Sequence, residues 1–393
     1  MRIVQLVRDV HPRAGGPPRV VIGSSIALAA LGHEVSIAAI GTADDARTVH
    51  AAWPELRRGG VTLRLFVPSR PAFLGASAAL ARAMRADGGD YDLMHMHGVW
   101  DGCLIAAARA ARGARRPYFI SPHGMLDRWS MARSAAKKKA LLVLGGGNRF
   151  LAGAAGMIFG TADEAEEADR IAPDVARITV PNGVDARMVA PRDASAADRL
   201  HAAIPATRNW SRTILFYSRL HPKKNVDGLI AAFARVADAF PGTGLLIAGI
   251  ADDAAYEAQI RAAAAAPALA GRIVVTTALT GPDSRFVLDA VDVFALPSHQ
   301  EGFSIAIIEA MARGIPVLIS DRCHMPEVAE TGAGEVVPPT PDGLVAGLTA
   351  LLSRDGDALR AAGACGARLV ADHFTWPSVA TRLEAIYAAA LRP

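Results

Sequence analysis

Short apolar runs alternate with helix-length amphipathic segments along the whole chain, and this alternation limits the possible folds more than any other feature. The runs are apolar at successive positions, which is typical of strands buried on both faces. Strands of this kind, separated by helices, form parallel sheets covered by helices on both sides. In the first half they are predicted at Arg2–Val7, Glu34–Ile40, Val61–Val67, Asp92–His97, Tyr118–Ser121, Gly156–Gly160 and Arg177–Val180.

The same pattern begins again in the second half of this 393-residue chain. Its strands are predicted at Thr213–Tyr217, Gly244–Ala248, Arg272–Thr276, Val291–Leu296, Pro316–Ile319 and Gly334–Val337. At roughly 150 residues per domain, the length suggests two or three domains. The pattern predicts two doubly wound α/β domains, residues 1–190 and 205–375. The polar, proline-bearing segment at about Val189–Arg212 is the expected linker, and Trp376–Leu391 has the pattern of an amphipathic helix.

Composition excludes several classes of protein. With 51% hydrophobic and 20% charged residues, the chain can bury large cores and is not of the disordered type. The chain has three cysteines that lie far apart in sequence, Cys103, Cys323 and Cys365. Their odd number and wide spacing argue against a disulfide framework or a zinc site and favour a reducing cytoplasm. No signal peptide and no run of about 18 apolar residues is found, so no membrane span is expected.

Charge is unevenly distributed. The net charge of +4 is too small to indicate nucleic-acid binding, and no nucleic-acid partner is expected. Residues 1–190 nevertheless carry +7 and the remainder −3. An anionic partner is therefore expected for the first domain.

Open parallel sheets bind ligands beyond the carboxyl ends of their strands, and Glu301 and Glu309 follow the predicted strand Val291–Leu296. Ser304 can cap the helix between them, and the free amide groups of a helix N-terminus suit phosphate. Eight helical residues span about 12 Å, whereas a hydrolytic carboxylate pair needs about 5–9.5 Å. The two glutamates are therefore expected to contact different parts of one long ligand. The alternative is an accidental spacing on a helix surface.

A basic loop, with Arg219 and Lys224, follows the strand Thr213–Tyr217 and opens a helix. Two cations at that edge suit a diphosphate, because Arg offers a planar fork and Lys a point charge. The alternative is a solvated basic loop.

Two glycines, Gly15 and Gly16, follow the first strand and allow a ligand to approach the backbone closely. The segment is not G-x-G-x-x-G, and no acidic residue follows at the expected position after the second strand, so dinucleotide binding is disfavoured. An ordinary strand-to-helix turn is the alternative.

Two histidines, His97 and His123, each precede a glycine at the end of neighbouring strands, which favours catalysis or acceptor binding over a structural role. His95 is expected on the opposite face of the sheet from His97 and is left out of the site. Asn182 lies in Pro181–Asp185, where Asn-Gly is also simply turn chemistry.

Taken together, the order of these motifs resembles the family-four retaining glycosyltransferases of the GT-B fold, most of all bacterial exopolysaccharide and lipopolysaccharide glycosyltransferases. The likeness extends over nearly the whole chain. It is carried by the Gly15–Gly16 loop, Ser121–Leu126, Pro181–Asp185, the Arg219 and Lys224 pair, the Glu301 and Glu309 segment, and the helix that begins at Trp376. The resemblance implies two Rossmann-like domains facing a central cleft. Residues 1–190 would bind the acceptor, 205–375 would bind the nucleotide sugar, and 376–393 would cross back to the first domain.

The resemblance also implies roles for residues. Arg219 and Lys224 would hold the donor diphosphate, Glu301 would contact the sugar hydroxyls, and Glu309 would bond the nucleotide ribose. The backbone amides of Gly302, Phe303 and Ser304 would bind phosphate, and Gly15 and Gly16 would contact the donor in the cleft. His123 would lie beside the reacting sugar. His97 and Asn182 would lie on the acceptor side. His123, Glu301, Arg219 and Lys224 would form the catalytic set. The family usually has Gly where this chain has Asn225, but Asn tolerates left-handed backbone angles.

The expected function is therefore transfer of a hexosyl unit, with retention, from a UDP- or GDP-sugar to a glycan or lipid-linked glycan in polysaccharide biosynthesis. No metal and no cofactor are expected. An epimerase on the same fold is one alternative, although it needs acid or base carboxylates beyond Glu301 and Glu309. A two-domain sugar-binding protein is another, against which stand the missing export signal and the two diphosphate cations.

A basic stretch, Arg109–Lys139, holds nine Lys and Arg residues against one acid, Asp127, with apolar Trp129 and Met131 among them. Such a segment suits an anionic membrane surface or a lipid-diphosphate acceptor. A solvated helix face is the alternative. The expected location is the cytoplasm, with peripheral attachment to the inner face of the membrane.

Overall fold

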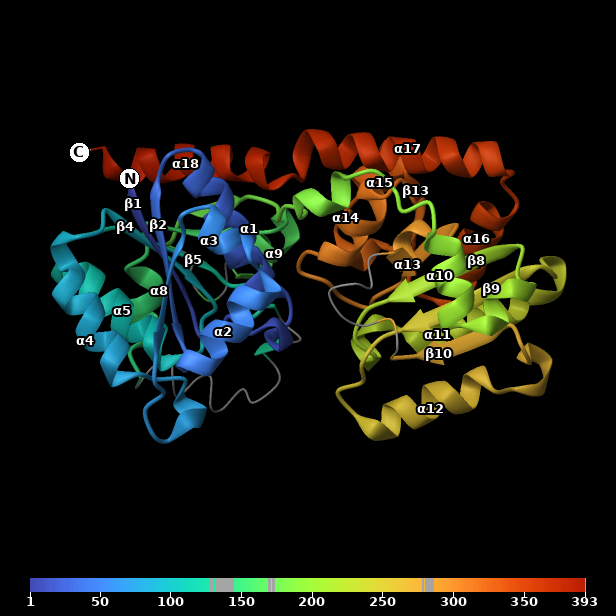
Figure 1. Cartoon of the computed structure of the whole chain (residues 1–393), viewed down its shortest axis with the longest axis horizontal. Coiled ribbons are helices and arrows are strands. Elements are labelled where there is room, and N and C mark those ends of the chain that lie inside the picture. The colour runs from blue at the N-terminus through green and yellow to red at the C-terminus, as the bar shows by residue number, and fades with distance from the viewer. Residues whose placement is uncertain are drawn as a thin grey trace. The chain divides into compact units, whose positions relative to one another are not determined.

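The computed structural model describes residues 1–127, 130–131, 145–168, 171, 174–277, 279 and 286–392, and the chain divides into two compact units (Figure 1). The first unit comprises Met1–Gly183 with Trp376–Pro393, and the second comprises Val184–Thr375. All 13 predicted strands are present, seven in one sheet and six in the other, and their pairings are parallel. The predicted fold class, doubly wound α/β, is confirmed.

The first sheet has the order β3-β2-β1-β4-β5-β6-β7. Its strands are β1 (Arg2–Val7), β2 (Glu34–Ile40), β3 (Thr62–Phe66), β4 (Leu93–His97), β5 (Tyr118–Ser121), β6 (Gly156–Phe159) and β7 (Arg177–Thr179). The helices described in this unit are α1 (Gly16–Ala30), α2 (Ala43–Ala52), α3 (Glu55–Arg58), α4 (Ala78–Ala86), α5 (Gly102–Gly113), α8 (Gly147–Ala152), α9 (Ala162–Ala168) and α18 (Trp376–Leu391).

The strand order of the first sheet reverses between β1 and β4, which creates the switch point where such sheets bind ligands. Val7 is in register with His97, and His97 with Ser121. The loops that follow β1, β4 and β5 therefore leave the sheet side by side at its carboxyl edge.

Helix α18 packs on α1 of the first unit, and two glycines make room for its first residue, Trp376. A Cβ atom at Gly23 would lie 2.1 Å from the Trp376 ring, and one at Gly183 would lie 2.6 Å from it. The glycine of the Pro181–Asp185 motif is thus required by packing.

The second sheet has the order β10-β9-β8-β11-β12-β13. Its strands are β8 (Arg212–Tyr217), β9 (Thr243–Ala248), β10 (Ile273–Thr276), β11 (Val293–Leu296), β12 (Val317–Ser320) and β13 (Gly334–Val337). The helices described in this unit are α10 (Ala196–Ala203), α11 (Val226–Val236), α12 (Ala254–Ala264), α13 (Phe286–Asp289), α14 (Ile305–Ala312), α15 (Glu327–Glu330), α16 (Pro341–Leu352) and α17 (Gly356–His373). The switch point lies between β8 and β11, where Ile214 is in register with Val293.

The expected linker at Val189–Arg212 is wrong, because this segment belongs to the second unit. It contains α10, and Leu200, Ile204 and Trp210 are buried in the core of that unit. The boundary falls between residues 183 and 184, rather than between 190 and 205.

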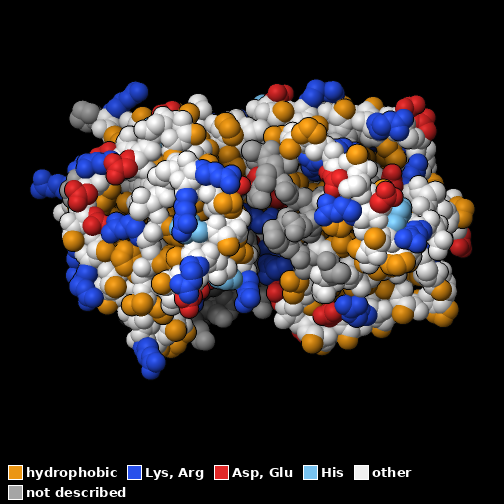
Figure 2. Space-filling model, in the orientation of Figure 1, with side chains coloured by type: hydrophobic (Ala, Val, Ile, Leu, Met, Phe, Trp, Pro, Cys, Tyr) orange, Lys and Arg blue, Asp and Glu red, His pale blue; other side chains and the backbone are white. Residues whose placement is uncertain are grey.

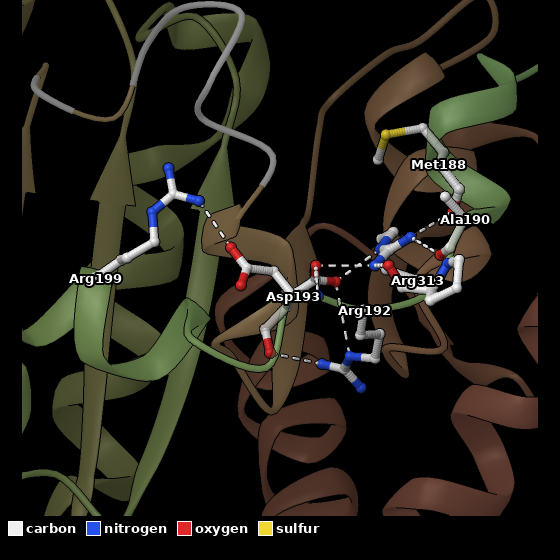
Figure 3. Close-up of polar contacts among 8 residues, drawn as sticks. Met188, Ala190, Arg192, Asp193, Arg199 and Arg313 are labelled. Carbon is white, nitrogen blue, oxygen red and sulfur yellow. Dashed lines mark hydrogen bonds and ion pairs between the residues drawn. The ribbon is translucent and has the colours of Figure 1, made fainter.

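Figure 3 shows polar contacts that attach this segment to the rest of the second unit. The Arg313 guanidinium is buried and binds both carboxylate oxygens of Asp289, at 2.6 and 2.8 Å. It also donates hydrogen bonds to the carbonyl oxygens of Met188, at 3.0 Å, and Ala190, at 2.5 Å. The segment is thus fastened to the second unit by hydrogen bonds to its backbone.

Within the described ranges, no helix has the length and apolar character that crossing a bilayer requires. Arg128, Trp129 and residues 132–139 of the basic stretch lie outside the described residues. A lipid-facing role for that stretch stays a prediction.

Candidate functional site

Two motifs that are 77 residues apart in sequence meet at the carboxyl edge of the second sheet. Lys224 ends a 3-10 turn after β8, and Glu301 lies in the loop after the neighbouring strand β11. The Lys224 Nζ atom is 2.5 Å from Glu301 Oε1, and the Ser298 hydroxyl donates to the same oxygen at 2.6 Å. The two side chains are only 13% and 9% exposed. The predicted grouping of these two motifs is therefore present as a largely buried ion pair.

A layer of hydrogen bonds holds this loop in place. The Ser320 hydroxyl, at the end of β12, donates to the carbonyl oxygen of Ser298 at 2.5 Å, and the Glu301 amide donates to the carbonyl oxygen of Arg322 at 3.0 Å. The buried Cys323 thiol donates to the carbonyl oxygen of Leu296 at 3.4 Å. Burial, together with the nearby Glu301 carboxylate, raises the pKa of Cys323 to about 12, so this thiol is not a nucleophile.

Between Lys224 and α11, Asn225 adopts the left-handed conformation that the sequence analysis allowed for it, with φ of 56° and ψ of 43°. Its side-chain amide donates to the carbonyl oxygens of Pro297, at 3.1 Å, and Pro339, at 3.3 Å. The asparagine therefore permits the sharp turn and also ties the basic loop to the loop after β11.

The second predicted diphosphate cation, Arg219, takes no part in the Lys224–Glu301 contact in this structure. It pairs with Asp252, a residue of the loop after β9, at 2.6 Å, and its side chain is 64% exposed. An exposed ion pair of this kind contributes little free energy. Arg219 can exchange Asp252 for a ligand anion at small cost.

Helix α14 begins directly after the Glu301 loop. Ser304 is its N-cap residue by backbone position, but within the described part of the chain its side chain makes no capping hydrogen bond, so the predicted cap is wrong in that respect. The first amide groups of the helix thus keep their capacity to bind an anion. The Phe303 ring packs on Phe374 at 5.8 Å between centroids, and Glu309 is half-buried further along the helix. Gly302, in the loop itself, is also half-buried.

At the carboxyl edge of the first sheet, Gly15 and Gly16 lead into α1. Gly15 has φ of 86°, which favours glycine, and a Cβ atom at either position would meet no atom within 4 Å. Glycine is needed at Gly15 for the backbone path, and the space above both residues is open.

His97 and His123 are joined by a hydrogen bond, with 2.9 Å between His97 Nδ1 and His123 Nε2. The other ring nitrogen of His97 lies 2.7 Å from Oε1 of the buried Gln5. Burial, with smaller contributions from His95 and His123, lowers the pKa of His97 well below its usual value, and burial lowers the pKa of His123 to about 4. Since His97 is 3% exposed and both its nitrogens have protein partners, the structure places it behind His123 rather than against an acceptor.

The prediction that His95 points away from His97 is wrong. Side chains two residues apart along a strand share a face, and the two rings lie 4.2 Å apart. His95 Nε2 is 2.8 Å from the Ser121 hydroxyl, and His95 Nδ1 is 2.6 Å from the hydroxyl of Tyr387 in α18. Burial lowers the pKa of His95 to about 3 and raises the pKa of Tyr387. His95 and Tyr387 are therefore both uncharged at neutral pH.

The turn that presents His123 has an unusual backbone, because His123 and Gly124 both have positive φ, 53° and 73°. The buried Glu164 carboxylate fixes this turn by accepting the Gly124 amide at 2.5 Å and the Gly160 amide at 3.0 Å. Burial raises the pKa of Glu164, and the two hydrogen bonds, which lower it, only partly offset this effect. Glu164 was not predicted as a site residue, although Thr161 and Glu164 have the spacing of a capping box, and the Glu164 amide does donate to Thr161 Oγ1 at 3.2 Å.

Asn182 follows the edge strand β7, two strands away from β5, and is half-buried. Its assignment to the acceptor side stays a prediction. Among the described residues, no group of three or more His, Cys, Asp and Glu side chains is arranged to hold a metal ion.

Two family models match the chain. One, described as a glycosyl transferase 4-like domain, matches residues 15–183, and the other, glycosyl transferases group 1, matches residues 201–364. The first match lies within the first unit, and the second match lies within the second unit.

Individual relatives agree with these models. D-inositol 3-phosphate glycosyltransferase of Segniliparus rotundus is 34% identical over 216 residues, 54% of this chain, and the match spans about half of that protein, 47%. GDP-mannose-dependent alpha-(1-6)-phosphatidylinositol dimannoside mannosyltransferase of Mycobacterium tuberculosis is 27% identical over 98% of this chain and 95% of its own length.

Among solved structures, Anabaena HepE in complex with UDP and glucose has a TM-score of 0.76. Its identity is 18%, with 99% of this chain and 100% of that chain covered, so the likeness concerns the fold. With the two parallel sheets, this likeness shows the GT-B fold. The two family models, which together match residues 15–183 and 201–364, show that this chain belongs to the family-four glycosyltransferases.

Proposed function

We propose that this protein is a nucleotide-sugar-dependent, retaining hexosyltransferase that moves a hexosyl unit from a UDP- or GDP-sugar to a glycan or lipid-linked glycan acceptor. The observation that carries the proposal is the Lys224–Glu301 pair at the switch point of the second sheet. A nearly buried ion pair adds little stability by itself. Its position beside the exposed Arg219 and the start of α14 suits a ligand that presents both phosphate and hydroxyl groups.

In this proposal, Lys224 and Arg219 stabilise the negative charge that grows on the nucleoside diphosphate as the bond between the anomeric carbon and the phosphate oxygen breaks. Glu301 accepts hydrogen bonds from the sugar hydroxyls, and Glu309 accepts from the ribose. The departing phosphate takes the proton of the acceptor hydroxyl, whose oxygen forms the new bond on the same face of the sugar. The neutral His123 contacts the reacting sugar.

The rival functions differ in what they need. An epimerase needs further acid or base carboxylates at the site, and Glu164, the buried carboxylate near His123, is already held by two backbone amides. A sugar-binding protein without transferase activity would have no use for the two cations. Nucleotide binding therefore separates a transferase from a simple sugar binder.

The experiment is thermal unfolding of the full chain with UDP, GDP and no nucleotide. We expect one nucleotide to raise the midpoint for the wild type and to have little effect on Lys224→Met. Arg360→Met, which removes a charge from a 74% exposed side chain of the second unit, is the control and should shift like the wild type. A wild type that responds to neither nucleotide would contradict the proposal.

We further propose that transfer needs no metal ion, because Lys224 and Arg219 can meet the charge of the leaving diphosphate. Turnover should therefore persist in EDTA. Complete loss of turnover in EDTA, with recovery on adding Mn²⁺ or Mg²⁺, would overturn this part of the proposal. GDP-mannose is the first donor to test, because the relative that matches 98% of this chain is named for it.

We also propose a lipid-linked acceptor at an anionic membrane surface. The name of that same relative includes a phosphatidylinositol dimannoside. In the described residues, three large apolar side chains are exposed in the loop between β3 and α4: Val67, Phe73 and Leu74, at 62%, 78% and 48%. Figure 2 shows Lys and Arg side chains beside apolar ones on the visible face of the first unit, at the left. Apolar side chains flanked by cations suit the surface of an anionic bilayer.

Sedimentation with anionic and with neutral vesicles, at low and at high salt, tests the membrane proposal. Wild type should bind anionic vesicles at low salt, and Lys137/Lys138/Lys139→Glu should release it, since each basic residue near such a surface is worth about 1 kcal/mol. Equal, salt-insensitive partitioning of both proteins would refute membrane binding and leave the transferase proposal intact.

A further inference from the structure

A chain of hydrogen bonds runs from the interior of the first sheet to His123. Gln5, in the middle of β1, is fully buried, and its Oε1 atom lies 2.7 Å from His97 Nε2. His97 Nδ1 lies 2.9 Å from His123 Nε2, and the two rings are stacked with 5.2 Å between centroids. The donor and acceptor at each step of this chain depend on which nitrogen of each imidazole carries a proton.

The order of donors follows from the orientation of the Gln5 amide, which turns its Oε1 atom toward His97 and leaves its buried Nε2 atom without a hydrogen-bond partner among the described residues. An amide oxygen can only accept, so His97 Nε2 must carry the proton that it donates to Gln5. His97 is neutral at pH 7, because burial keeps its pKa well below its usual value. Its Nδ1 atom then carries a lone pair and can only accept a hydrogen bond. His123 must therefore donate from Nε2, which leaves Nδ1 of the neutral His123 unprotonated.

We propose that Gln5 is a positioning residue: acting through His97, it holds His123 in the tautomer protonated on Nε2, so that Nδ1 is a hydrogen-bond acceptor for a hydroxyl of the bound sugar. The tautomer does not depend on the proposed function, whereas the identity of the hydroxyl donor does rest on it. The nitrogen of an imidazole that faces a substrate is commonly set in this way, by the partner of the other nitrogen.

Neighbouring groups leave this order undisturbed. His95, whose ring lies 4.2 Å from that of His97, is neutral and is engaged by Tyr387 and by Ser121. Glu164 holds the backbone of the next residue, Gly124, rather than the His123 ring. Within the described part of the chain, His123 Nδ1 has no protein partner, which is what a substrate-facing acceptor requires.

The test reads the tautomer directly. Nitrogen NMR of the full chain, with ¹⁵N-labelled histidine side chains, distinguishes protonated from unprotonated ring nitrogens, and His123→Gln identifies the His123 signals. In the wild type without ligands we expect a protonated Nε2 and an unprotonated Nδ1. A wild-type His123 that is protonated on Nδ1 would overturn the proposal without recourse to any variant.

Two substitutions of Gln5 have different expected effects. Gln5→Leu removes the acceptor, so His97 loses its fixed orientation and His123 should populate both tautomers. Gln5→Glu places a carboxylate on His97 Nε2, which favours a doubly protonated His97. Its Nδ1 then donates to His123 Nε2, and the proton of His123 should move to Nδ1. An unchanged His123 tautomer in both variants would contradict the role of Gln5.

Steady-state kinetics test whether the tautomer of His123 affects turnover. For both Gln5 variants we expect kcat to fall about 10- to 100-fold, by analogy with the loss seen when the partner that orients a metal-bound histidine is removed, with little change in the KM of the donor. Ser121→Ala is the control, since Ser121 bonds His95 and not His97 or His123. It should keep the wild-type tautomer and turnover. Equal kcat in wild type and Gln5 variants would refute the positioning role, whereas a wild type without any transfer would refute only the proposed function.

Discussion

At the residue scale, the two glutamates of the α14 segment stand in different environments. Glu301 is nearly buried and shares its Oε1 atom with Lys224 and Ser298. Glu309 is half-buried, inside the helix. A carboxylate that is already oriented by two protein donors suits a contact that must be accurate as a bond breaks. Substitutions of the two glutamates should therefore have different effects on binding and turnover.

Glu309→Gln should mainly weaken nucleotide binding, because a ribose contact exists both before and during the reaction. Glu301→Gln should lower kcat more than it raises the KM of the donor, because its sugar contact strengthens in the transition state. Steady-state kinetics of both variants with the preferred donor measure this difference. Wild-type constants in both would mean that the spacing of the two glutamates is accidental.

Sequence reasoning at this scale succeeded for residues that directly follow a strand, such as Lys224 and Glu301. Their position at the carboxyl edge depends only on the alternation of strands and helices. Gln5 was not predicted, because its role depends on the register of neighbouring strands and on which face its side chain occupies. His95 was placed wrongly for a different reason, because side chains two residues apart on a strand share a face and the sequence alone would have put His95 on the side of His97.

At the scale of elements, α14 connects the candidate donor site to the interior of the second unit. Its first turn follows Glu301, and Arg313 directly after its last turn forms the buried pair with Asp289. The polar segment that includes Met188 and Ala190 is tied to the same guanidinium. A segment that had the composition of a linker is thus an integral part of this unit.

Arg313→Met should destabilise the second unit by about 3–5 kcal/mol, since it leaves the Asp289 carboxylate buried without its partner. Arg360→Met, which removes an exposed ion pair with Asp357, should cost about 0–1 kcal/mol. Urea unfolding followed by circular dichroism compares the two. Similar losses in both variants would show that the buried pair has no special role.

The strands were predictable because buried parallel strands are marked by runs of apolar residues. Helix α17 was not predicted, and its glycines explain why. Gly363 lowers helix propensity, yet a Cβ atom there would lie 2.0 Å from the carbonyl oxygen of Gly314. The close packing that requires this glycine depends on tertiary structure, which a local pattern does not reveal.

At the scale of the whole molecule, the first unit buries neutral histidines, and this links its stability to pH. Burial places the pKa of His95 at about 3 and that of His97 well below its usual value, so both folded pKa values lie under the unfolded value of about 6.5. Below about pH 6.5 the unfolded chain therefore binds more protons than the folded chain. Stability must decrease as the pH falls through this range.

Each of these two histidines should contribute a loss of about 1.4 kcal/mol per pH unit below about pH 6. Urea unfolding at several pH values between 7.5 and 4.5 measures the slope. His95→Gln removes one titrating group and should reduce the slope by about one proton. Identical slopes for the variant and the wild type would mean that His95 is already protonated in the folded protein.

Donor consumption, followed by proton NMR, tests the central claim most directly. The full chain is incubated with a small panel of UDP- and GDP-sugars, GDP-mannose among them, and the nucleotide released and the first-formed anomer of the sugar product are identified. The account predicts that one donor is consumed, that its nucleoside diphosphate is released, that the product keeps the anomeric configuration of the donor, and that Glu301→Gln slows the release. Release of no nucleoside diphosphate from any donor, or a product of inverted configuration, would contradict it.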